Sequence, residues 1–204
     1  LPILGHQQAR WLGDYFKARG MTFSQLYCGD MQRHEQTAQG IIAGLQQNIE
    51  TTVHRGLNEF DFQKVGKGYL AAHPDKRLPD NPKPADFYRL LKLAMLAWSQ
   101  DELDKAHLQE SWAEFHGRVK QALSDVCAQS QKQPVLIVSS GGAIAMLMSL
   151  VLGLEAKQVI ELNMQIRNTS LSHFYFNKDI VRLASFNNIP HLDHPDRLDA
   201  ITFS

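Results

Sequence analysis

The sequence predicts a three-layer α/β/α fold with a mainly parallel sheet and one antiparallel strand. Three observations support this prediction. First, short β-branched segments alternate with longer segments whose apolar residues recur at helical spacing. Second, residues 134–154 have the pattern of a strand, a tight turn and a helix. Third, a hairpin pattern comes late in the chain. With 204 residues, 44% of them hydrophobic and 21% charged, the chain matches one globular domain, which we expect to span residues 1–204.

The first segments follow the order helix, strand, helix, strand. Apolar residues recur at helical spacing over residues 2–20, and Gly20 stands where a glycine commonly ends a helix. Residues 25–28 have the composition of a buried strand, and Asp30 is the expected N-cap of a second helix. Residues 51–54 are the next predicted strand. Strands separated by a helix in this way are typical of a parallel sheet.

The middle of the chain is predicted to contain a long loop and two helices. Residues 61–84 are rich in Pro and Gly and show no apolar period, so we expect an irregular loop near the functional site. Helical spacing returns at residues 87–98, and Ser111 with Glu114 forms a capping-box pattern that begins the next helix. Both helices are expected to pack one face on the sheet.

Residues 134–154 are the most informative segment of the chain. Their apolar length suggests a membrane span, but the sequence Ser-Ser-Gly-Gly at residues 139–142 interrupts it, with β-branched residues before and Ala, Leu and Met after. A strand, a tight turn and a helix are therefore the better interpretation. A hairpin is expected over residues 168–186, turning at 177–179, and it supplies the antiparallel strand.

Charge and composition argue against several classes of partner. Lys+Arg and Asp+Glu number 21 each, so no net field favours nucleic acid or an anionic membrane, and we expect neither partner. Cys28 and Cys127 lack the spacing of a disulfide framework or a zinc site. The N-terminal residues do not resemble a signal peptide, and we expect none. Both observations favour a cytoplasmic protein. His191 and His194 suggest a metal site, but no third ligand has a recognisable spacing, so we expect no metal.

Two strand-to-helix turns are candidate ligand sites, because ligands of such folds bind where strands end and helices begin. Arg33 falls in the first turn of its helix, where its guanidinium could grip two phosphate oxygens; the alternative is a surface arginine paired with Glu35. In the turn at 139–142, glycines allow close approach to a ligand and serine hydroxyls add hydrogen bonds. The alternative there is a tight turn that needs glycine only for its geometry.

A third candidate is Glu59, which follows the predicted strand at 51–54 in the sequence Leu-Asn-Glu-Phe. Near a phosphate, its carboxyl could act as a general acid or base with a pKa raised by burial. A glutamate at the end of a strand is also an ordinary surface residue. The sequence leaves both interpretations open.

Taken in order, these segments resemble the histidine phosphatase superfamily, also called the phosphoglycerate-mutase-like family. The sequence Pro-Ile-Leu-Gly-His-Gln-Gln-Ala-Arg at residues 2–10 is similar to the family segment Pro-Leu-Thr-x-x-Gly-x-x-Gln-Ala. Residues 26–38 resemble its strand followed by Ser-Ser-x-Leu-x-Arg-Ala-x-x-Thr-Ala. Residues 57–59 match its Leu-x-Glu segment, and residues 135–142 match the strand that ends in a His-Gly pair. Four motifs in the correct order, over most of the chain, are far more specific than any one of them.

The resemblance implies a phosphoryl transfer that uses neither a metal nor a cofactor. Arg33, Ser140 and Gly141 would bind the phosphoryl group of a small phosphorylated substrate, and Glu59 would donate a proton to the leaving oxygen. In the family a histidine attacks the phosphorus and becomes a phosphohistidine. Water, or another hydroxyl in the mutases, then takes the phosphoryl group, and positioning and charge stabilisation dominate the transfer.

The chain departs from the family pattern at two positions. The family's nucleophile lies in an Arg-His-Gly motif on the first strand, just before the segment that matches Pro2, and none of the 9 histidines here has those neighbours. We therefore expect this strand and its nucleophilic histidine upstream of Leu1. Ser140 stands where the family has a second histidine that hydrogen-bonds the phosphoryl oxygens. A neutral hydroxyl in place of a charged donor loses about 1 kcal/mol, or about tenfold in rate.

The leading hypothesis is a phosphatase that hydrolyses phosphomonoesters through a phosphohistidine. The mutase branch is disfavoured, because Ser140 weakens the site that must retain a phosphorylated intermediate. The alternative from another class is a catalytically degenerate phosphate-binding or regulatory protein on the same fold. A third hypothesis is a structural domain whose motifs are coincidental. The sequence leaves the substrate and the oligomeric state open.

Overall fold

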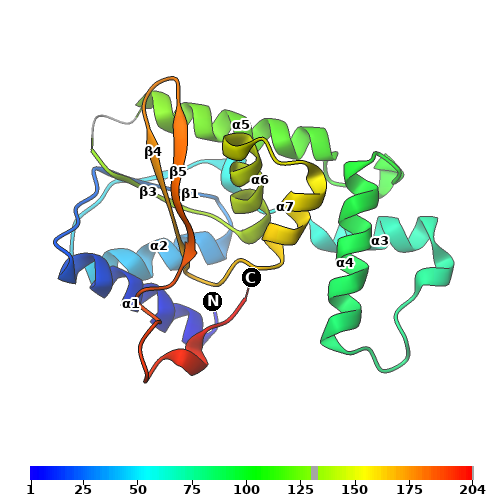
Figure 1. The fold of residues 1–204 in the computed structure, drawn as a ribbon, viewed down its shortest axis with the longest axis horizontal. Helices are drawn as coiled ribbons and strands as arrows, with labels where there is room; N and C mark the ends of the chain where they lie inside the picture. Colours follow the sequence, from blue (N-terminus) through cyan, green and yellow to red (C-terminus); the bar gives the residue numbers. More distant parts are fainter. Residues whose placement is uncertain (130–132, 204) are drawn as a thin grey trace.

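The computed structural model describes residues 1–129 and 133–203, and helices and strands alternate along them (Figure 1). The helices are α1 (Ile3–Ala18), α2 (Gln32–Leu45), α3 (Phe62–Ala72), α4 (Pro84–Ser99), α5 (Trp112–Gln129), α6 (Gly141–Leu152) and α7 (Ala156–Asn163). The strands are β1 (Gln25–Cys28), β2 (Thr51–Val53), β3 (Val135–Val138), β4 (Leu171–Phe176) and β5 (Val181–Asn188).

The central sheet is parallel and has the order β2-β1-β3. Cys28 at the end of β1 is level with Val53 of β2 and Val138 of β3, so the segments that follow these strands meet at one edge of the sheet. β4 and β5 form the antiparallel hairpin expected at residues 168–186, which is a separate sheet. The predicted α/β class, with a parallel sheet and an antiparallel component, is confirmed.

The two faces of the central sheet carry different apolar clusters, because side chains alternate along a strand. Leu26, Cys28 and Val138 pack with α1 and α2 on one face. Tyr27 packs with Leu57 and α5 on the other. In Figure 1, α1 and α2 lie below the sheet and α5 lies above it, which gives the three layers.

Helices α1 and α2 pack closely because glycines lie at their interface. A Cβ on Gly13 would lie 2.1 Å from the carbonyl oxygen of Ile41, and a Cβ on Gly44 would lie 2.2 Å from the carbonyl oxygen of Arg10. Both carbonyls belong to helix backbone, so neither can give way without moving a whole helix. The distance between α1 and α2 therefore depends on these two glycines.

We expect Gly44→Ala to lower the free energy of unfolding by about 1–3 kcal/mol, because overpacking this contact forces the two helices apart. Gly117→Ala is the matched control, since Gly117 is exposed on α5 and nothing lies within 4 Å of its missing Cβ. That substitution should raise stability by about 0.5–1 kcal/mol. Urea denaturation measures both values, and a Gly44 variant as stable as the Gly117 variant would contradict this account of the packing.

Helices α3 and α4 form an arm at one end of the molecule (right in Figure 1). Trp98 of α4 stacks on Phe115 of α5, with ring centroids 5.6 Å apart, and lies 5.0 Å from the ring of Phe60. These three rings belong to the apolar cluster that includes residues of α6 and α7. The arm is therefore continuous with the core of the protein.

The expected irregular loop at residues 61–84 is wrong over its first half, because Phe62–Ala72 form α3. The apolar side of α3 is short: Val65 and Tyr69, one turn apart, are its buried apolar side chains. Lys67 and the two glycines between them hide this period in the sequence. From residue 73 to residue 83 the chain is irregular apart from one short 3₁₀ turn, as expected.

The predicted start of the second helix is also corrected. Met31, rather than Asp30, is the N-cap of α2, and no side chain caps this helix. The Asp30 carboxylate instead accepts hydrogen bonds from Asn58 at 2.6 Å and from Arg55 at 2.8 Å. Asp30 thus ties the turn after β1 to the segment after β2, a contact between residues far apart in the sequence.

Two expectations about later helices can be compared with the structure. The capping box of α5 forms as predicted: the Glu114 N–H donates to Ser111 Oγ at 3.2 Å, and the Ser111 N–H donates to the Glu114 carboxylate at 2.7 Å.

The apolar helix α6 has 12 residues. Within residues 1–129 and 133–203, no helix combines the length and the apolar composition needed to span a membrane.

Candidate functional site

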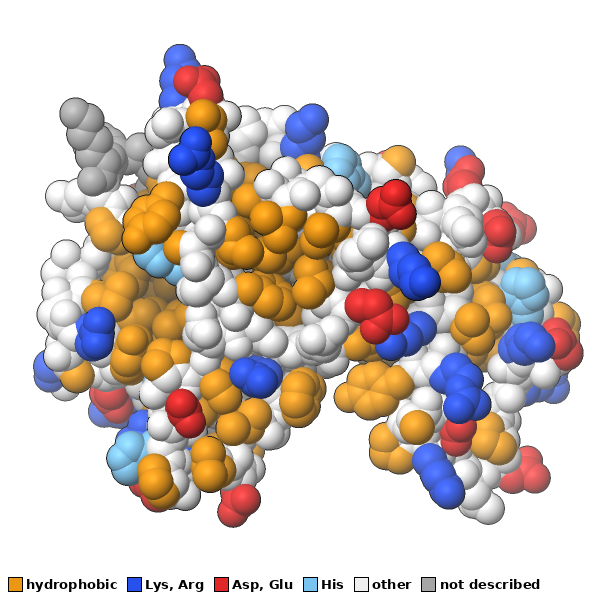
Figure 2. Space-filling model, in the orientation of Figure 1, with side chains coloured by type: hydrophobic (Ala, Val, Ile, Leu, Met, Phe, Trp, Pro, Cys, Tyr) orange, Lys and Arg blue, Asp and Glu red, His pale blue; other side chains and the backbone are white. Residues whose placement is uncertain are grey.

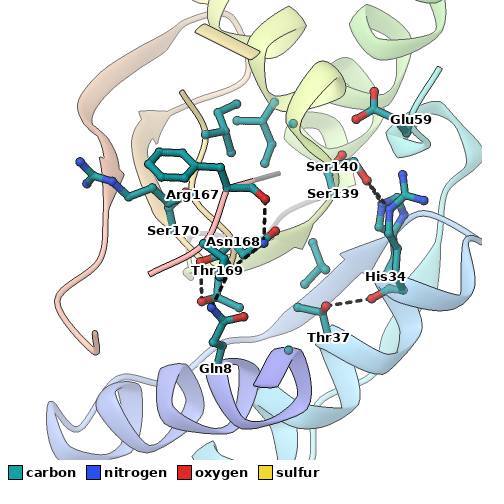
Figure 3. Close-up of a pocket in the computed structure, with 18 of the residues that line it drawn as sticks. Gln8, His34, Thr37, Glu59, Ser139, Ser140, Arg167, Asn168, Thr169 and Ser170 are labelled. Carbon is teal, nitrogen blue, oxygen red and sulfur yellow. Dashed lines mark hydrogen bonds between the residues drawn. The ribbon is translucent and has the colours of Figure 1, made fainter. Parts of the chain in front are cut away.

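A cavity of about 680 Å³ opens where β1 and β3 lead into their helices. Its walls come from α1, the first turn of α2, the end of β3, the start of α6 and the segment that precedes β4. His34, Ser140 and Glu59 lie on one side of it, and Gln8 and Asn168 on the other (Figure 3). Hydrophobic side chains gather on the body of the molecule beside the hairpin, whereas charged side chains are frequent on the arm (Figure 2).

Arg33 and His34 occupy the first turn of α2 and both contact Ser140. Arg33 Nε donates to Ser140 Oγ at 3.0 Å, and His34 Nε2 lies 2.6 Å from the same oxygen. Ser140 is the N-cap of α6, so these contacts join the turns that follow β1 and β3. Within the described part of the chain, the two terminal nitrogens of Arg33 form no hydrogen bond, and they are available to an anion in the cavity.

Gly141 and Gly142 begin α6 at the same edge of the sheet. The first N–H groups of a helix lack partners within the helix and favour anions. The Gly142 N–H donates to Glu59 Oε2 at 2.9 Å. A Cβ on Gly142 would lie 2.2 Å from Glu59 Oε1, so glycine is required for this carboxyl to reach the helix.

The Glu59 carboxyl has a raised pKa. Burial is the main cause, and it outweighs the lowering effects of the Gly142 and Phe60 N–H groups and of the Arg33 and Arg118 charges. The Phe60 N–H donates to Glu59 Oε1 at 3.1 Å. A carboxyl whose pKa lies above its ordinary value keeps its proton to higher pH, which is what a general acid needs.

Arg118 of α5 holds the backbone that carries Glu59. Its guanidinium donates to three backbone carbonyls, those of Gly56 at 3.1 Å, Asn58 at 2.7 Å and Glu59 at 3.4 Å. The Glu110 carboxylate accepts two hydrogen bonds from the same guanidinium, each of 2.7 Å. Trp98 Nε1 in the arm donates to the Glu110 carbonyl at 3.0 Å. A continuous set of hydrogen bonds therefore links the arm to the backbone of Glu59.

The cavity also separates two strand edges. β3 pairs with β1 along one edge, β4 pairs with β5 along one edge, and no strand within residues 1–129 and 133–203 pairs with their other edges. Leu136 and Ile137 line the cavity and are only half-buried, although the sequence of β3 is as apolar as that of a strand buried on both sides. The two edges offer backbone N–H and C=O groups that an extended segment could pair with.

The structure brings together the four site residues predicted from the sequence, which all line this cavity: Arg33, Glu59, Ser140 and Gly141. Arg33 contacts Ser140 and forms no ion pair with Glu35 in the described part of the chain. Arg33 is exposed, as the alternative interpretation expected, but its side-chain partner is Ser140 rather than Glu35.

The two C-terminal histidines are placed elsewhere. His191 Nε2 lies 2.9 Å from Thr169 Oγ1, and His194 contacts Asp196. Among residues 1–129 and 133–203, no group of three or more His, Cys, Asp or Glu side chains is arranged to hold a metal ion.

Reasoning from the sequence missed His34 and Arg118. The signal for His34 is its position directly after Arg33, where the family block quoted above has alanine. Arg118 gives no such signal, because its partners in the Glu59 segment are backbone carbonyls, one of them 62 residues away.

Comparisons with known proteins agree on one family. The family model that matches is described as the histidine phosphatase superfamily (branch 1), and it matches residues 1–189. No curated protein matches the sequence. Among solved structures, a phosphoglycerate mutase from Bacillus anthracis str. Sterne is similar, with a TM-score of 0.64 and 19% identity over 91% of this chain and 81% of that one.

Two further solved structures are phosphatases by their descriptions. A mutant phosphoserine phosphatase from Entamoeba histolytica, in complex with phosphoserine, has a TM-score of 0.63 and 22% identity over 91% of this chain and 83% of that one. A putative alpha-ribazole-5'-P phosphatase from Escherichia coli str. K-12 substr. MG1655 has a TM-score of 0.66 and 16% identity over 90% and 81%. At these identities the likeness shows a common fold.

Proposed function

This chain belongs to the histidine phosphatase superfamily, and on that premise we propose that it is a metal-independent phosphatase that hydrolyses small phosphomonoesters through a phosphohistidine. One observation carries the proposal: Arg33, Ser140 and the start of α6 converge with a Glu59 carboxyl of raised pKa on one cavity. Cationic and N–H groups suit the phosphoryl oxygens, and a protonated carboxyl suits the leaving oxygen. The similar structures include phosphatases and a mutase, which supports phosphoryl transfer as the class of reaction.

The proposed reaction has two displacements. In the first, a histidine nitrogen bonds to phosphorus as the bond to the leaving oxygen breaks, and Glu59 gives its proton to that oxygen. In the second, water attacks phosphorus, the Glu59 carboxylate takes a proton from the water, and the N–P bond breaks to release inorganic phosphate. Arg33, the Ser140 hydroxyl and the Gly141 N–H would stabilise the charge on the non-bridging oxygens in both steps.

The nucleophilic histidine is proposed to lie on an extended segment upstream of Leu1 that pairs with the open edges of β3 and β4. Those edges flank the cavity, and Leu1 and Pro2 line it. A parallel strand next to β3 would end at the same edge of the sheet, beside Arg33 and Ser140. Residues 1–204 would then be one histidine-phosphatase-like domain that lacks this first strand.

The cytoplasm is the proposed compartment. Cys28 and Cys127 are both free thiols, and free thiols persist in reducing compartments. A small phosphorylated metabolite is the proposed partner, because the cavity of about 680 Å³ matches the size of pockets for small molecules.

The direct test is hydrolysis by the full-length protein of a panel of phosphomonoesters in the presence of EDTA. We expect phosphate release that EDTA does not reduce. Quenching with a radiolabelled substrate should trap a phosphoprotein that is stable in base and labile in acid, as a phosphohistidine is. Phosphate binding without any turnover would instead favour the catalytically degenerate phosphate-binding protein.

Binding of phosphate analogues gives a separate prediction. We expect orthovanadate at about 100 times its Kd to stabilise the full-length protein by about 2.7 kcal/mol, which raises Tm by about 5–10 °C in a domain of this size. Thermal melting measures the shift, with chloride at equal ionic strength as the control. No shift with millimolar vanadate or phosphate would contradict a phosphoryl site and favour a structural domain.

A further inference from the structure

Ser140 lies between two nitrogen atoms in the wall of the cavity. Arg33 Nε lies 3.0 Å and His34 Nε2 lies 2.6 Å from its Oγ. A guanidinium can only donate hydrogen bonds, so one lone pair of Oγ accepts from Arg33. The other lone pair and the hydroxyl proton remain. One of them serves the hydrogen bond with His34, and the other is available to a ligand in the cavity.

The tautomer of His34 determines whether the Ser140 hydroxyl donates to His34 or accepts from it. His34 is 2% exposed, and its Nδ1 has no hydrogen-bond partner within the described residues. A proton on Nδ1 would leave a buried N–H unpaired, which is rarer in folded proteins than an unpaired acceptor. We therefore assign the proton to Nε2, which donates it to Ser140 Oγ. Both lone pairs of Oγ are then occupied, and the hydroxyl proton is left to point toward the cavity.

The imidazole of His34 is neutral near pH 7 in this arrangement. Its pKa is lowered to about 4: burial is the main cause, the Arg33 charge adds to the lowering, and the Asp30 carboxylate opposes both. A neutral imidazole has one N–H, and here that N–H is directed at Ser140. His34 lines the cavity, and its N–H acts on Ser140.

The fold makes room for this imidazole. A Cβ on Gly29 would lie 2.3 Å from His34 Nδ1 and 2.3 Å from Asn58 Oδ1, although the φ angle of Gly29 is not in the left-handed region. Glycine is therefore favoured at position 29 because a side chain would not fit there, and not because of the backbone conformation. In the family block quoted above, serine stands at the position of Gly29 and alanine at the position of His34. Together with Ser140, which stands in place of a histidine, these three replacements form one spatial cluster.

We propose that His34 is a positioning residue: with Arg33, it fixes the Ser140 hydroxyl as a hydrogen-bond donor to a phosphoryl oxygen of the substrate, an inference that rests on the proposed function. Relative to the family pattern, the imidazole is absent from the turn after β3, where Ser140 stands, and is present instead in the first turn of α2, where the family has alanine. A hydroxyl that accepts two hydrogen bonds, one of them from a cation, is a stronger donor than an isolated serine. The pair Ser140–His34 therefore compensates for the missing histidine.

The test moves the imidazole from residue 34 to residue 140 in the full-length protein, and it measures kcat and KM on a phosphomonoester. We expect H34A to lower kcat/KM about tenfold, the equivalent of about 1.4 kcal/mol. S140H alone should also lower kcat/KM, because the new ring must occupy space beside His34 Nε2, which lies 2.6 Å from Ser140 Oγ. The double variant H34A/S140H should recover to within about threefold of wild type, an interaction between neighbouring sites of about 1 kcal/mol or more.

The dependence of activity on pH provides a second measurement, which would not change if His34 had only a structural role. The double variant presents an imidazole directly to the phosphoryl group, so it should acquire a decline in activity as the pH rises and this imidazole loses its proton. The wild-type enzyme should show only the decline expected from Glu59 and no decline from an imidazole, because the pKa of His34 is about 4 and the ring stays neutral. Arg33, Asp30 and Glu59 are the charged groups around this position, and they are unchanged in both proteins.

Two control variants distinguish the effect of the hydrogen-bond donor from the effect of filling space. H34A/S140L fills the same space without an N–H and should not recover activity, whereas H34Q keeps a donor near the position of Nε2 and should lose less than H34A. Thermal melting confirms that each variant is folded. A folded H34A enzyme with wild-type kcat/KM, or a folded H34A/S140H enzyme with no recovery, would overturn the positioning role alone. A wild-type protein that neither turns over phosphomonoesters nor binds vanadate would overturn the proposed function as well.

Discussion

Replacing Glu59 with glutamine is expected to lower kcat for alkyl phosphomonoesters by about 10²–10⁴-fold, the usual contribution of a general acid. Glutamine retains the shape of the carboxyl and can still accept from the Gly142 N–H, but it has no proton to give to a leaving oxygen. An aryl ester such as dinitrophenyl phosphate has a leaving oxygen that needs no proton. The loss on that substrate should therefore be small, and steady-state kinetics on both esters measure the difference.

The pH dependence of the same reaction tests the raised pKa of Glu59. Because an acid must be protonated to act, kcat/KM should fall as the pH rises through the Glu59 pKa, which burial places above the ordinary value of 4.5. E59Q should remove this decline. Glu102→Gln, at an exposed position after the arm, is the control and should behave as wild type. An equal loss on both esters in E59Q would assign Glu59 to substrate binding instead of proton donation.

Arg33→Ala is expected to lower kcat/KM by about 10²–10³-fold, the usual effect of removing one donor that stabilises transition-state charge. The substitution removes the guanidinium of a residue that lines the cavity, and it also removes the hydrogen bond from Nε to Ser140 Oγ. Arg33→Lys keeps the charge but loses the planar pair of donors, so its activity should fall between those of Arg33→Ala and wild type.

The control for Arg33 is Arg19→Ala, which removes an exposed cation at the C-cap of α1, outside the cavity. Its kcat/KM should stay within about twofold of wild type, as is usual for exposed charges. Vanadate titration by thermal melting separates binding from chemistry, because R33A should also lose most of the stabilisation by vanadate. A variant that keeps full vanadate affinity would place the phosphoryl group elsewhere in the cavity.

The central sheet and its ligand edge could be predicted because the information for them is local. Residues 25–28 and 135–138 are short apolar runs, and each leads directly into an amphipathic or apolar helix. Parallel pairing of two such units brings the turns that follow them together, and this alone places Arg33 beside Ser140. The hairpin at 168–186 was equally accessible, because its turn residues and its alternating strands lie within one segment.

The helix at 62–72 and the contacts of Asp30 could not be predicted in this way. α3 buries few apolar side chains and is held by the aromatic cluster of the arm, whose members come from α4 and α5. Asp30 has the right residue type for a helix cap, but Asn58 and Arg55 compete for its carboxylate across the sheet edge. In both cases a tertiary contact overrides a local preference, and one sequence gives no sign of it.

The contact of His34 with Ser140 shows the same limit within the site. The two residues are 106 positions apart, and a histidine in the first turn of a helix is an ordinary surface residue by its pattern. Only the pairing of β1 with β3 makes them neighbours. The role of Gly29 cannot be predicted from the sequence either, because the groups that occupy the space beside it are the His34 ring and the Asn58 side chain, 5 and 29 residues further along the chain.

The hydrogen bonds from Trp98 through Glu110 and Arg118 to the Glu59 backbone make the arm and this glutamate one unit of local unfolding. When α4 detaches, Glu110 loses the contact that orients it, and the carbonyls that Arg118 holds lose their common donor. Hydrogen exchange at the backbone amides near Glu59 should then occur with the same opening free energy as exchange in α4. By linkage, a substrate that binds to the arm in its packed position also increases the fraction of molecules in which the Glu59 backbone is held in place.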